Sequence, residues 1–178
     1  INEKTQEVQT VKEHSENTAR LCQKYAIPAL QTVMYTMGLL HDIGKYQPSF
    51  QQRINGKNIR VEHSTCGAIV AGQKYKSALG LLMQYCIAGH HSGIPNGGFS
   101  TDSADQSTLV GRMKRVFEDF SAYQQDIDLP DMDLQAFVEY CADGCSSKDS
   151  MIDKFAFLTR YCFSCLVDAD SIDTAQFC

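Results

Sequence analysis

The sequence has no excess of positive charge and no apolar run long enough to cross a bilayer. Lysine and arginine number 16, and aspartate and glutamate number 21, which gives a formal net charge of −5. This balance excludes a general nucleic-acid coat protein and a polybasic membrane binder, because both depend on net positive charge. The longest apolar stretch, residues 77–89, is shorter than the ~18 residues of a membrane span and is interrupted by Gln84. We therefore expect no membrane partner, while a local basic patch stays compatible with the composition.

Three further absences concern targeting, motor activity and domain number. The first ten residues, INEKTQEVQT, do not place a basic segment before an apolar one, so we expect no signal peptide and a cytoplasmic protein. No G-x-x-x-x-G-K-[ST] segment occurs, which excludes an ATP-driven helicase. Neither a linker nor an internal repeat divides the 178 residues, so we expect a single domain over residues 1–178. Because the chain does not begin with Met, we expect it to be cut from a longer one.

The eight cysteines are open to two interpretations. Most lie in apolar surroundings and, without a signal peptide, in a reducing compartment, which favours buried thiols. Four of them follow a C-x3-C-x16-C-x2-C spacing, which is close to that of a zinc ribbon. The last two of these lie within a strongly helical stretch that lacks the tight turn of a zinc knuckle, so thiols are favoured. The zinc alternative concerns Cys141, Cys145, Cys162 and Cys165.

Apolar residues recur at helical rather than alternating spacing, which predicts an all-α fold. No alternating run is long enough to require a sheet. Residues 46–60 are polar and are predicted to be mostly loop. Residues 94–108 are rich in Gly, Ser, Asn and Asp and are predicted to be a mobile surface loop. The predicted helices are residues 12–25, 29–40, 64–71, 77–89, 109–123, 133–143 and 150–169.

Two of the predicted buried helices end in the same way. One is followed by His41-Asp42 and the other by His90-His91, and a glycine comes two positions after each pair. Polar groups at the ends of apolar helices make a concave, partly dry site in which metal ligands are preorganised. Imidazole and carboxylate together suit first-row divalent metals. Adjacent residues diverge by about 100° on a helix, so His41-Asp42 can serve two metals, and a metal pair can activate water for in-line displacement at phosphorus.

The His41-Asp42 pair, preceded by an apolar helix and followed by Ile-Gly-Lys, resembles the signature of the HD superfamily of metal-dependent phosphohydrolases. His14 in VKEHSENTARL resembles the first ligand of that superfamily, and Asp170 in an Ala-Asp-Ser-Ile setting resembles its last. The complete order H…HD…H…HH…D is similar to the HD nuclease domain of the CRISPR-associated helicase-nuclease of type I systems. That order includes His63 in VEHSTCGAIVAG and the double histidine in AGHHSGIPN, and it uses every histidine of the chain.

The resemblance implies an HD-domain helical bundle whose metal site lies at helix ends. It implies two divalent metal ions, which are manganese, cobalt, nickel, iron or magnesium. Lys45 matches the lysine of the family's HD-x-G-K motif, which implies that it holds a phosphate oxygen or orients a water, and it joins His41 and Asp42 as a catalytic residue. The metal ligands that the resemblance implies are His14, His41, Asp42, His63, His90, His91 and Asp170, or Asp168 in place of Asp170.

The choice between the two C-terminal aspartates rests on helix geometry. Asp168 and Asp170 are two positions apart on a predicted helix, so their side chains point to nearly opposite faces and only one can reach the metals. Asp170 lies in register with the apolar residues Phe163, Leu166 and Val167, and it is therefore preferred.

Basic residues cluster at three places along the chain. Lys45, Arg53, Lys57 and Arg60 follow the HD motif and are predicted to guide a DNA backbone toward the metals. Lys74 and Lys76 form the second group, and Arg112, Lys114 and Arg115 form the third. Ordinary solvated surface is the alternative for every one of these groups.

The function implied by the resemblance is hydrolysis of phosphodiester bonds in single-stranded DNA during CRISPR interference, an antiviral defence. The implied partners are single-stranded DNA, a helicase domain in the same or a separate chain, and a CRISPR RNA-guided surveillance complex. Two alternatives stay open. One is an HD phosphohydrolase that acts on nucleotides or cyclic nucleotides, and the other is a non-catalytic metal-binding or interaction domain.

Overall fold

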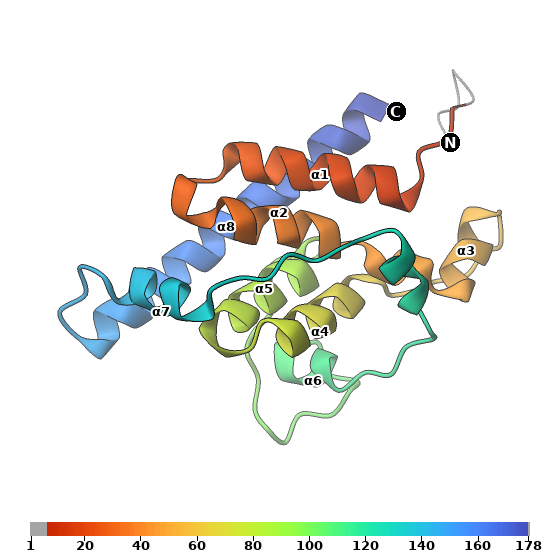
Figure 1. Ribbon diagram of the computed structural model, residues 1–178. Helices are drawn as coiled ribbons and strands as arrows, with labels where there is room; N and C mark the ends of the chain where they lie inside the picture. Colours follow the sequence, from red (N-terminus) through yellow and green to blue (C-terminus); the bar gives the residue numbers. More distant parts are fainter. Residues whose placement is uncertain (1–6, 178) are drawn as a thin grey trace.

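The computed structural model describes residues 7–177, and within this range it contains helices and no β-strand (Figure 1). The predicted all-α fold class is therefore confirmed. The α-helices are α1 (Val11–Tyr25), α2 (Gln31–Leu40), α3 (Pro48–Ile54), α4 (Ser64–Lys74), α5 (Ser77–Gly89), α6 (Leu109–Met113), α7 (Leu134–Ala142) and α8 (Lys148–Phe177). The 3-10 helices are Pro28–Leu30, Ile43–Tyr46 and Ser121–Gln125. No helix in the described part of the chain combines the length and apolar character needed to cross a membrane.

Two helical hairpins form the centre of the fold. In the first, α1 packs on α2 across a short turn that contains Pro28, and in the second α4 packs on α5 across the turn at Lys76. The long helix α8, blue in Figure 1, packs against α1, α2 and α5 and so joins the two hairpins. The shared core is aliphatic and includes the fully buried side chains of Leu30, Met34, Met37, Leu40, Leu79, Leu82, Met83, Ile87 and Leu166.

The hairpins are equivalent in length and sequence register, although no internal repeat was predicted. His14 lies in the first turn of α1 and His41 directly after α2, 27 positions later. His63 directly precedes α4 and His90 directly follows α5, again 27 positions later. At its open end, each hairpin therefore carries one histidine on each of its two arms. Besides the histidines, the identities that mark the repeat are too few to stand out in the sequence, and they are Glu13/Glu62, Ser15/Ser64, Ala19/Ala68, Ala29/Ala78, Leu30/Leu79, Met34/Met83 and Gly44/Gly93.

Close backbone contacts fix how the helices meet. A Cβ atom added at Gly38 would meet the backbone of Ala19, so α2 lies tightly against α1. A Cβ atom at Gly67 would meet the Leu40 carbonyl, which brings α4 against the end of α2. The start of α1 is fixed by a capping box, because the Thr10 hydroxyl accepts from the backbone N–H of Glu13 at 3.1 Å and the Glu13 carboxylate accepts from the N–H of Thr10 at 2.8 Å. This box holds the turn that carries His14.

Two predicted segments differ from the structure. Residues 46–60 were predicted as mostly loop, but α3 forms within them because Pro48 suits the first helical turn and Phe50 buries its ring. Residues 109–123 were predicted as one helix, but α6 ends at Met113, and the chain becomes helical again only as a short 3-10 turn. Beyond Met113, the ammonium of Lys114 donates to backbone carbonyls of the preceding loop instead. A local helical pattern cannot anticipate such tertiary hydrogen bonds.

The segment 94–108 forms no helix or strand, as predicted, and it is fastened to its surroundings. The backbone N–H of Leu109 donates to Asn96 at 2.8 Å, and the N–H of Val110 donates to Gly97 at 3.0 Å. The seven cysteines among residues 7–177 are free thiols, and Cys178 lies outside the described residues. Of the four cysteines with zinc-ribbon spacing, Cys141 and Cys162 are buried in the core. Within the described residues, these four do not converge into a group that could hold a metal ion.

Candidate metal centre

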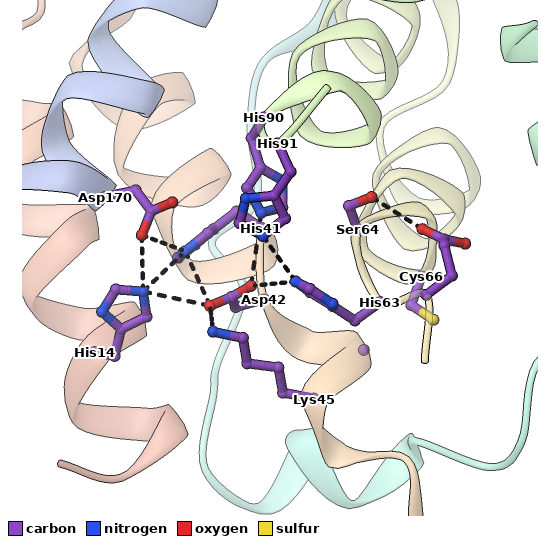
Figure 2. A network of polar contacts seen from close by, with 12 residues as sticks. His14, His41, Asp42, Lys45, His63, Ser64, Cys66, His90, His91 and Asp170 are labelled. Carbon is purple, nitrogen blue, oxygen red and sulfur yellow. Dashed lines mark hydrogen bonds and ion pairs between the residues drawn. The ribbon is translucent and has the colours of Figure 1, made fainter. Parts of the chain in front are cut away.

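The open ends of the two hairpins bring four histidines together. His14 Nε2 lies 3.2 Å from His41 Nε2 in the first hairpin. The rings of His63 and His90, at the open end of the second, have centroids 5.9 Å apart. The two ends face each other, since the rings of His41 and His90 lie edge to face at 5.2 Å (Figure 2). The equivalent placement of these histidines therefore follows from the hairpins themselves.

Hydrogen bonds on the outer ring nitrogens orient three of these histidines. His41 Nδ1 lies 2.7 Å from the carbonyl oxygen of Gly38, and His90 Nδ1 lies 2.8 Å from that of Ile87, each three residues earlier at a helix end. A carbonyl oxygen only accepts, so Nδ1 of each ring carries a hydrogen and Nε2 is the ring nitrogen that faces the centre. His14 Nδ1 makes the corresponding contact with the carboxylate of Asp173 at 2.7 Å. This is the arrangement by which proteins orient metal-binding imidazoles.

Asp173 was not among the predicted site residues. Its carboxylate is buried, and it also accepts a hydrogen bond from the Gln9 side-chain amide at 2.7 Å. It lies one turn after Asp170 on α8, so the spacing of the two acids on one helix face was a usable signal. Its function is to orient His14 from behind rather than to face the centre.

Asp42 lies between the two groups of histidines and directs one oxygen at each. Its Oδ2 atom is 3.3 Å from Nε2 of both His14 and His41. Its Oδ1 atom is 3.2 Å from His63 Nε2 and 3.6 Å from His90 Nε2. The side chain is almost fully buried. A single carboxylate thus faces both hairpins.

The remaining predicted ligands complete the two groups. Asp170 Oδ1 lies 3.1 Å from His14 Nε2 and 3.8 Å from His41 Nε2, whereas Asp168 is exposed on the same helix, so the structure brings only Asp170 to the centre. His91 is exposed, and its Nε2 lies 2.9 Å from that of His63. The sets whose donor atoms all lie within 4.8 Å of one another are Asp42, His63, His90 and His91; His14, His41 and Asp42; and His41, His90 and Asp170.

A comparison of the chain with protein-family profiles identifies its family. The profile of the HD domain matches residues 11–137, which is more than half of the chain. The chain belongs to the HD domain family. HD domains are typically metal-dependent phosphohydrolases, so the family indicates a hydrolase with a divalent-metal cofactor. A search of curated proteins found no match to this chain.

The match covers six of the seven ligands predicted for this HD domain, and the structure adds the seventh. Asp170 lies beyond residue 137, yet its contacts with His14 and His41 bring it to the same centre. The helix α8 therefore contributes to the HD site although it follows the matched region.

In this HD centre, the charged forms of His14, His41 and Asp42 are stabilised by one another. Burial alone would lower the pKa of His14, but hydrogen bonds to Asp170 and Asp42 raise it to about 10. Burial likewise opposes protonation of His41, and the charge of Asp42 raises its pKa to about 9. Burial would raise the pKa of Asp42, whereas the charges of His41 and Lys45 hold it well below its ordinary value. The carboxylates therefore stay ionised and attract cations.

Two histidines of the second hairpin, His90 and His91, have lowered pKa values. Burial lowers the pKa of His90. Burial, together with the charges of His90 and His63, lowers the pKa of His91 to about 4. At neutral pH these rings are unprotonated, which is the form that binds a metal ion.

The donor set of the HD centre fits divalent ions. His90 Nε2 and Asp42 Oδ1 are both buried, and neither makes a hydrogen bond. Buried polar atoms without a partner are rare in native proteins and point to an unmet ligand. Five imidazoles with two carboxylates match the preference of first-row transition metals for mixed nitrogen and oxygen donors.

Lys45 and Phe50 lie at the rim of the centre. The Lys45 ammonium forms an ion pair with Asp42 Oδ2. The Phe50 ring packs edge-on against the His63 ring at 4.9 Å, and the guanidinium of Arg53 lies over Phe50 at 5.6 Å. The structure thus places Lys45 and Arg53 beside the ligands. Lys57 and Arg60 are exposed further along the chain, where Lys57 donates to the Gln52 side chain at 3.0 Å.

The third basic group is not free surface. Arg112 is buried, with its guanidinium bonded to Ser64 and Thr65. The side chains of Lys114 and Arg115 donate to backbone carbonyls between residues 100 and 106. In the second group, Lys74 pairs with Asp131 at 3.1 Å. The alternative of free solvated surface is therefore wrong for Arg112. Lys114 and Arg115, just beyond α6, hold the loop that precedes this helix.

Proposed function

We propose that this HD domain is a nuclease that uses two divalent metal ions to hydrolyse phosphodiester bonds of single-stranded DNA in CRISPR interference. The observation that carries the proposal is the position of Asp42, whose two oxygens face two different sets of histidines. A carboxylate in that position is suited to bridge two ions. The order of the histidine and aspartate motifs, which resembles that of type I CRISPR nucleases, supports the substrate.

The residues divide into two half-sites around the shared carboxylate. His14, His41 and Asp170 would hold one ion, and His63, His90 and His91 would hold the other, with Asp42 contributing an oxygen to each. Paired divalent ions lower the pKa of a bound water and neutralise the charge that develops on the phosphate oxygens.

Lys45 would bind the phosphate next to the ions. Its ammonium contacts Asp42 and keeps about a quarter of its side-chain surface accessible, so it can turn toward a phosphate oxygen without crossing the core. As a compact point charge it would orient the phosphate for in-line attack. His41 and Asp42 would act at the same point by fixing the ions in place.

The remaining basic residues would lead the DNA strand away from the centre. Arg53 lies beside Phe50, next to the ligand His63, and Lys57 and Arg60 continue as exposed side chains along the same segment. The basic side chains of Arg112, Lys114 and Arg115 are occupied by internal contacts, so the α3 side is the better path. Exposed His91 leaves the centre open to a polymer on the other side of the ligands.

The domain would work beside a motor that it does not contain. We propose a helicase domain, in the same or a separate chain, that supplies single-stranded DNA after recruitment by an RNA-guided surveillance complex in the cytoplasm. The absence of a phosphate-binding loop in residues 1–178 supports a division of labour between unwinding and cleavage.

The deciding experiment is cleavage of circular single-stranded DNA in the presence of Mn²⁺, Co²⁺, Ni²⁺, Fe²⁺ or Mg²⁺. We expect linearisation and then degradation by the wild type, and only background cleavage by Asp42→Ala. Asp168→Asn is the matched control, because it removes an exposed acid of α8 and should cleave as the wild type does.

Parallel reactions with nucleoside phosphates and cyclic nucleotides test the rival phosphohydrolase. Faster hydrolysis of those small substrates than of DNA would overturn the nuclease proposal in favour of the rival. Full DNA cleavage by a clean Asp42→Ala preparation would refute the site assignment. A wild type that binds none of these metals would revive the non-catalytic alternative.

A further inference from the structure

His14 and His63 hold equivalent positions in the two hairpins but are oriented by different means. His14 is fixed through its ring, because Nδ1 contacts the Asp173 carboxylate. The Nδ1 atom of His63 is buried and has no hydrogen-bond partner. Behind the centre, His63 is therefore held by its backbone and by ring packing on Phe50, while its Nε2 atom faces Asp42 and His91.

The backbone on both sides of His63 is tied down by Glu62. This carboxylate accepts from the backbone N–H of Thr65 at 2.8 Å and lies 2.9 Å from the Ser64 hydroxyl, so it caps the start of α4. The Gln47 side-chain amide donates to the Glu62 carbonyl at 3.0 Å and to that of Gly44 at 2.9 Å. These bonds link the turn after Asp42 to the residue that precedes His63.

Arg112 of α6 closes this network from the opposite side. Its Nε donates to the Thr65 hydroxyl at 3.0 Å and its Nη2 to the Ser64 hydroxyl at 2.9 Å. Nη2 also lies 3.3 Å from Glu62 Oε1, which makes a largely buried ion pair. One guanidinium thus contacts Glu62, Ser64 and Thr65 around His63. Loss of Glu62 would leave the buried Arg112 without its carboxylate partner, whereas Glu62 also lies 3.7 Å from the Arg115 guanidinium.

The same arginine is linked to the chain that carries the other two histidines. The Ser64 hydroxyl lies 3.4 Å from the carbonyl of Ala88, two residues before His90. The segment after His91 is hydrogen-bonded to the start of α6, because the backbone N–H of Leu109 donates to the backbone carbonyl of Asn96. Arg112 therefore lies between the segment that carries His63 and the segment that carries His90 and His91. Among the described residues, its side-chain contacts are with Glu62, Ser64 and Thr65 and with no ligand of the first half-site.

We propose that Arg112 and Glu62 are a positioning pair that holds His63 in place and thereby sets the affinity of the half-site formed by His63, His90 and His91. The inference rests on the proposed function in that it requires two metal ions. Neither residue touches an ion or the substrate. The first half-site is oriented separately, from α8 through Asp173, and shares Asp42 with the second.

The experiment is a Mn²⁺ titration of the metal-depleted full chain by calorimetry, with stoichiometry checked by equilibrium dialysis. For the wild type we expect two ions. For Arg112→Gln and for Glu62→Gln we expect one ion bound with unchanged affinity and the other bound roughly 10- to 100-fold more weakly, as for other partners behind metal ligands. Arg160→Gln is the matched control, because its guanidinium is exposed on α8 and bonds only to the backbone one turn earlier.

A second readout separates positioning from general damage to the fold. Excess Mn²⁺ should restore DNA cleavage by Arg112→Gln. In contrast, Asp170→Asn should lose Mn²⁺ affinity at the half-site formed by His14, His41 and Asp170. If Arg112→Gln does not fold, Glu62→Gln carries the test, since the amide keeps an acceptor for the Thr65 N–H.

The outcomes distinguish this inference from the proposed function. A wild type that binds two ions and cleaves DNA, with variants that bind both ions as tightly, would overturn the positioning role alone. Equal weakening at both half-sites would also overturn it. A wild type that binds fewer than two ions would instead overturn the two-metal function on which the inference depends.

Discussion

At the scale of single residues, the HD centre contains histidines whose Nδ1 atoms already make hydrogen bonds within the protein. His41 and His90 give Nδ1 to a helix-end carbonyl, and His14 gives it to Asp173. Each ring thereby keeps Nε2 for the centre without needing a metal ion to orient it. Such preorganisation lowers the entropic cost of binding an ion.

Removal of the carboxylate behind His14 should weaken metal binding without touching a ligand. For Asp173→Asn we expect roughly 10- to 100-fold lower Mn²⁺ affinity at one half-site, because the imidazole loses a charged acceptor that fixes its orientation. Calorimetric titration measures this change, with Asp168→Asn as the control from the exposed face of α8. Unchanged affinity in Asp173→Asn would contradict the orienting role.

Stability of the metal-free protein should depend on pH with a maximum near 6.5. The pKa of His14 is raised to about 10 and that of His41 to about 9, so the folded state keeps protons that the unfolded chain releases above 6.5, and stability falls as pH rises from there. The pKa of His91 is lowered to about 4 and that of His90 is also lowered, so stability falls as pH drops below 6.5. Each proton difference contributes up to about 1.4 kcal/mol per pH unit.

Urea unfolding of chelator-treated protein between pH 5 and 9 measures this dependence. His41→Asn should flatten the alkaline side, because it removes one of the retained protons. A stability that rises steadily from pH 6.5 to 9 in the wild type would contradict the assignment.

At the scale of elements, the site depends on backbones that touch. The 3-10 turn after Asp42 lies against the start of α4, and a Cβ atom at Gly44 would meet the backbone of His63. The second glycine of interest, Gly38, brings α1 against α2 in the same way. Helix packing and metal-ligand geometry are therefore set by the same contacts.

Gly44→Ala should separate these elements. The added methyl group would push the start of α4 away from the turn, so we expect a loss of about 1–3 kcal/mol in unfolding free energy and weaker Mn²⁺ binding at the half-site of His63. Chemical denaturation and metal titration measure the two effects. Gly72→Ala is the matched control: its Cβ would meet only the movable side-chain amide of Gln84, and alanine is the better helix former by about 1 kcal/mol. Equal stability and metal affinity in Gly44→Ala and wild type would contradict this account.

At the scale of the whole molecule, the centre is the point where separate parts of the chain meet. Its ligands come from α1, the ends of α2 and α5, the start of α4, and α8. An ion bound there would cross-link elements that are otherwise joined by packing and by polar side-chain contacts. It would also supply positive charge for a phosphate in a chain whose net charge is −5.

Bound metal should accordingly stabilise the fold. At a Mn²⁺ concentration 100 times the dissociation constant, linkage predicts about 2.7 kcal/mol for one site. Thermal unfolding should shift to higher temperature with Mn²⁺ and return with EDTA, whereas Asp42→Ala should show no shift. An equal Mn²⁺ shift in Asp42→Ala would show that the ion stabilises from another place.

The sequence predicted those parts of the fold and site that depend on neighbours along the chain. The all-α class and the grouping of His41-Asp42 with His90-His91 followed from apolar helices that end in polar pairs. The contact of Asp173 with His14 and the burial of Arg112 depend on residues 159 and about 50 positions apart. Helix spacing places Asp173 on the same face as Asp170, but it does not identify the partner of either Asp173 or Arg112. The early end of α6 has the same cause, because side chains beyond it bond to a distant loop.

Among the equivalent ligand positions of the two hairpins, one differs in residue type, and this difference ranks the two half-sites. Asp42 follows His41 where His91 follows His90. An imidazole presents a single nitrogen once the other is engaged, whereas a carboxylate presents two oxygens, so only the first hairpin can lend a donor to its neighbour. The second hairpin contains no carboxylate ligand of its own and borrows one across the interface. The second half-site therefore depends on a donor from the first hairpin, whereas the first half-site needs none from the second.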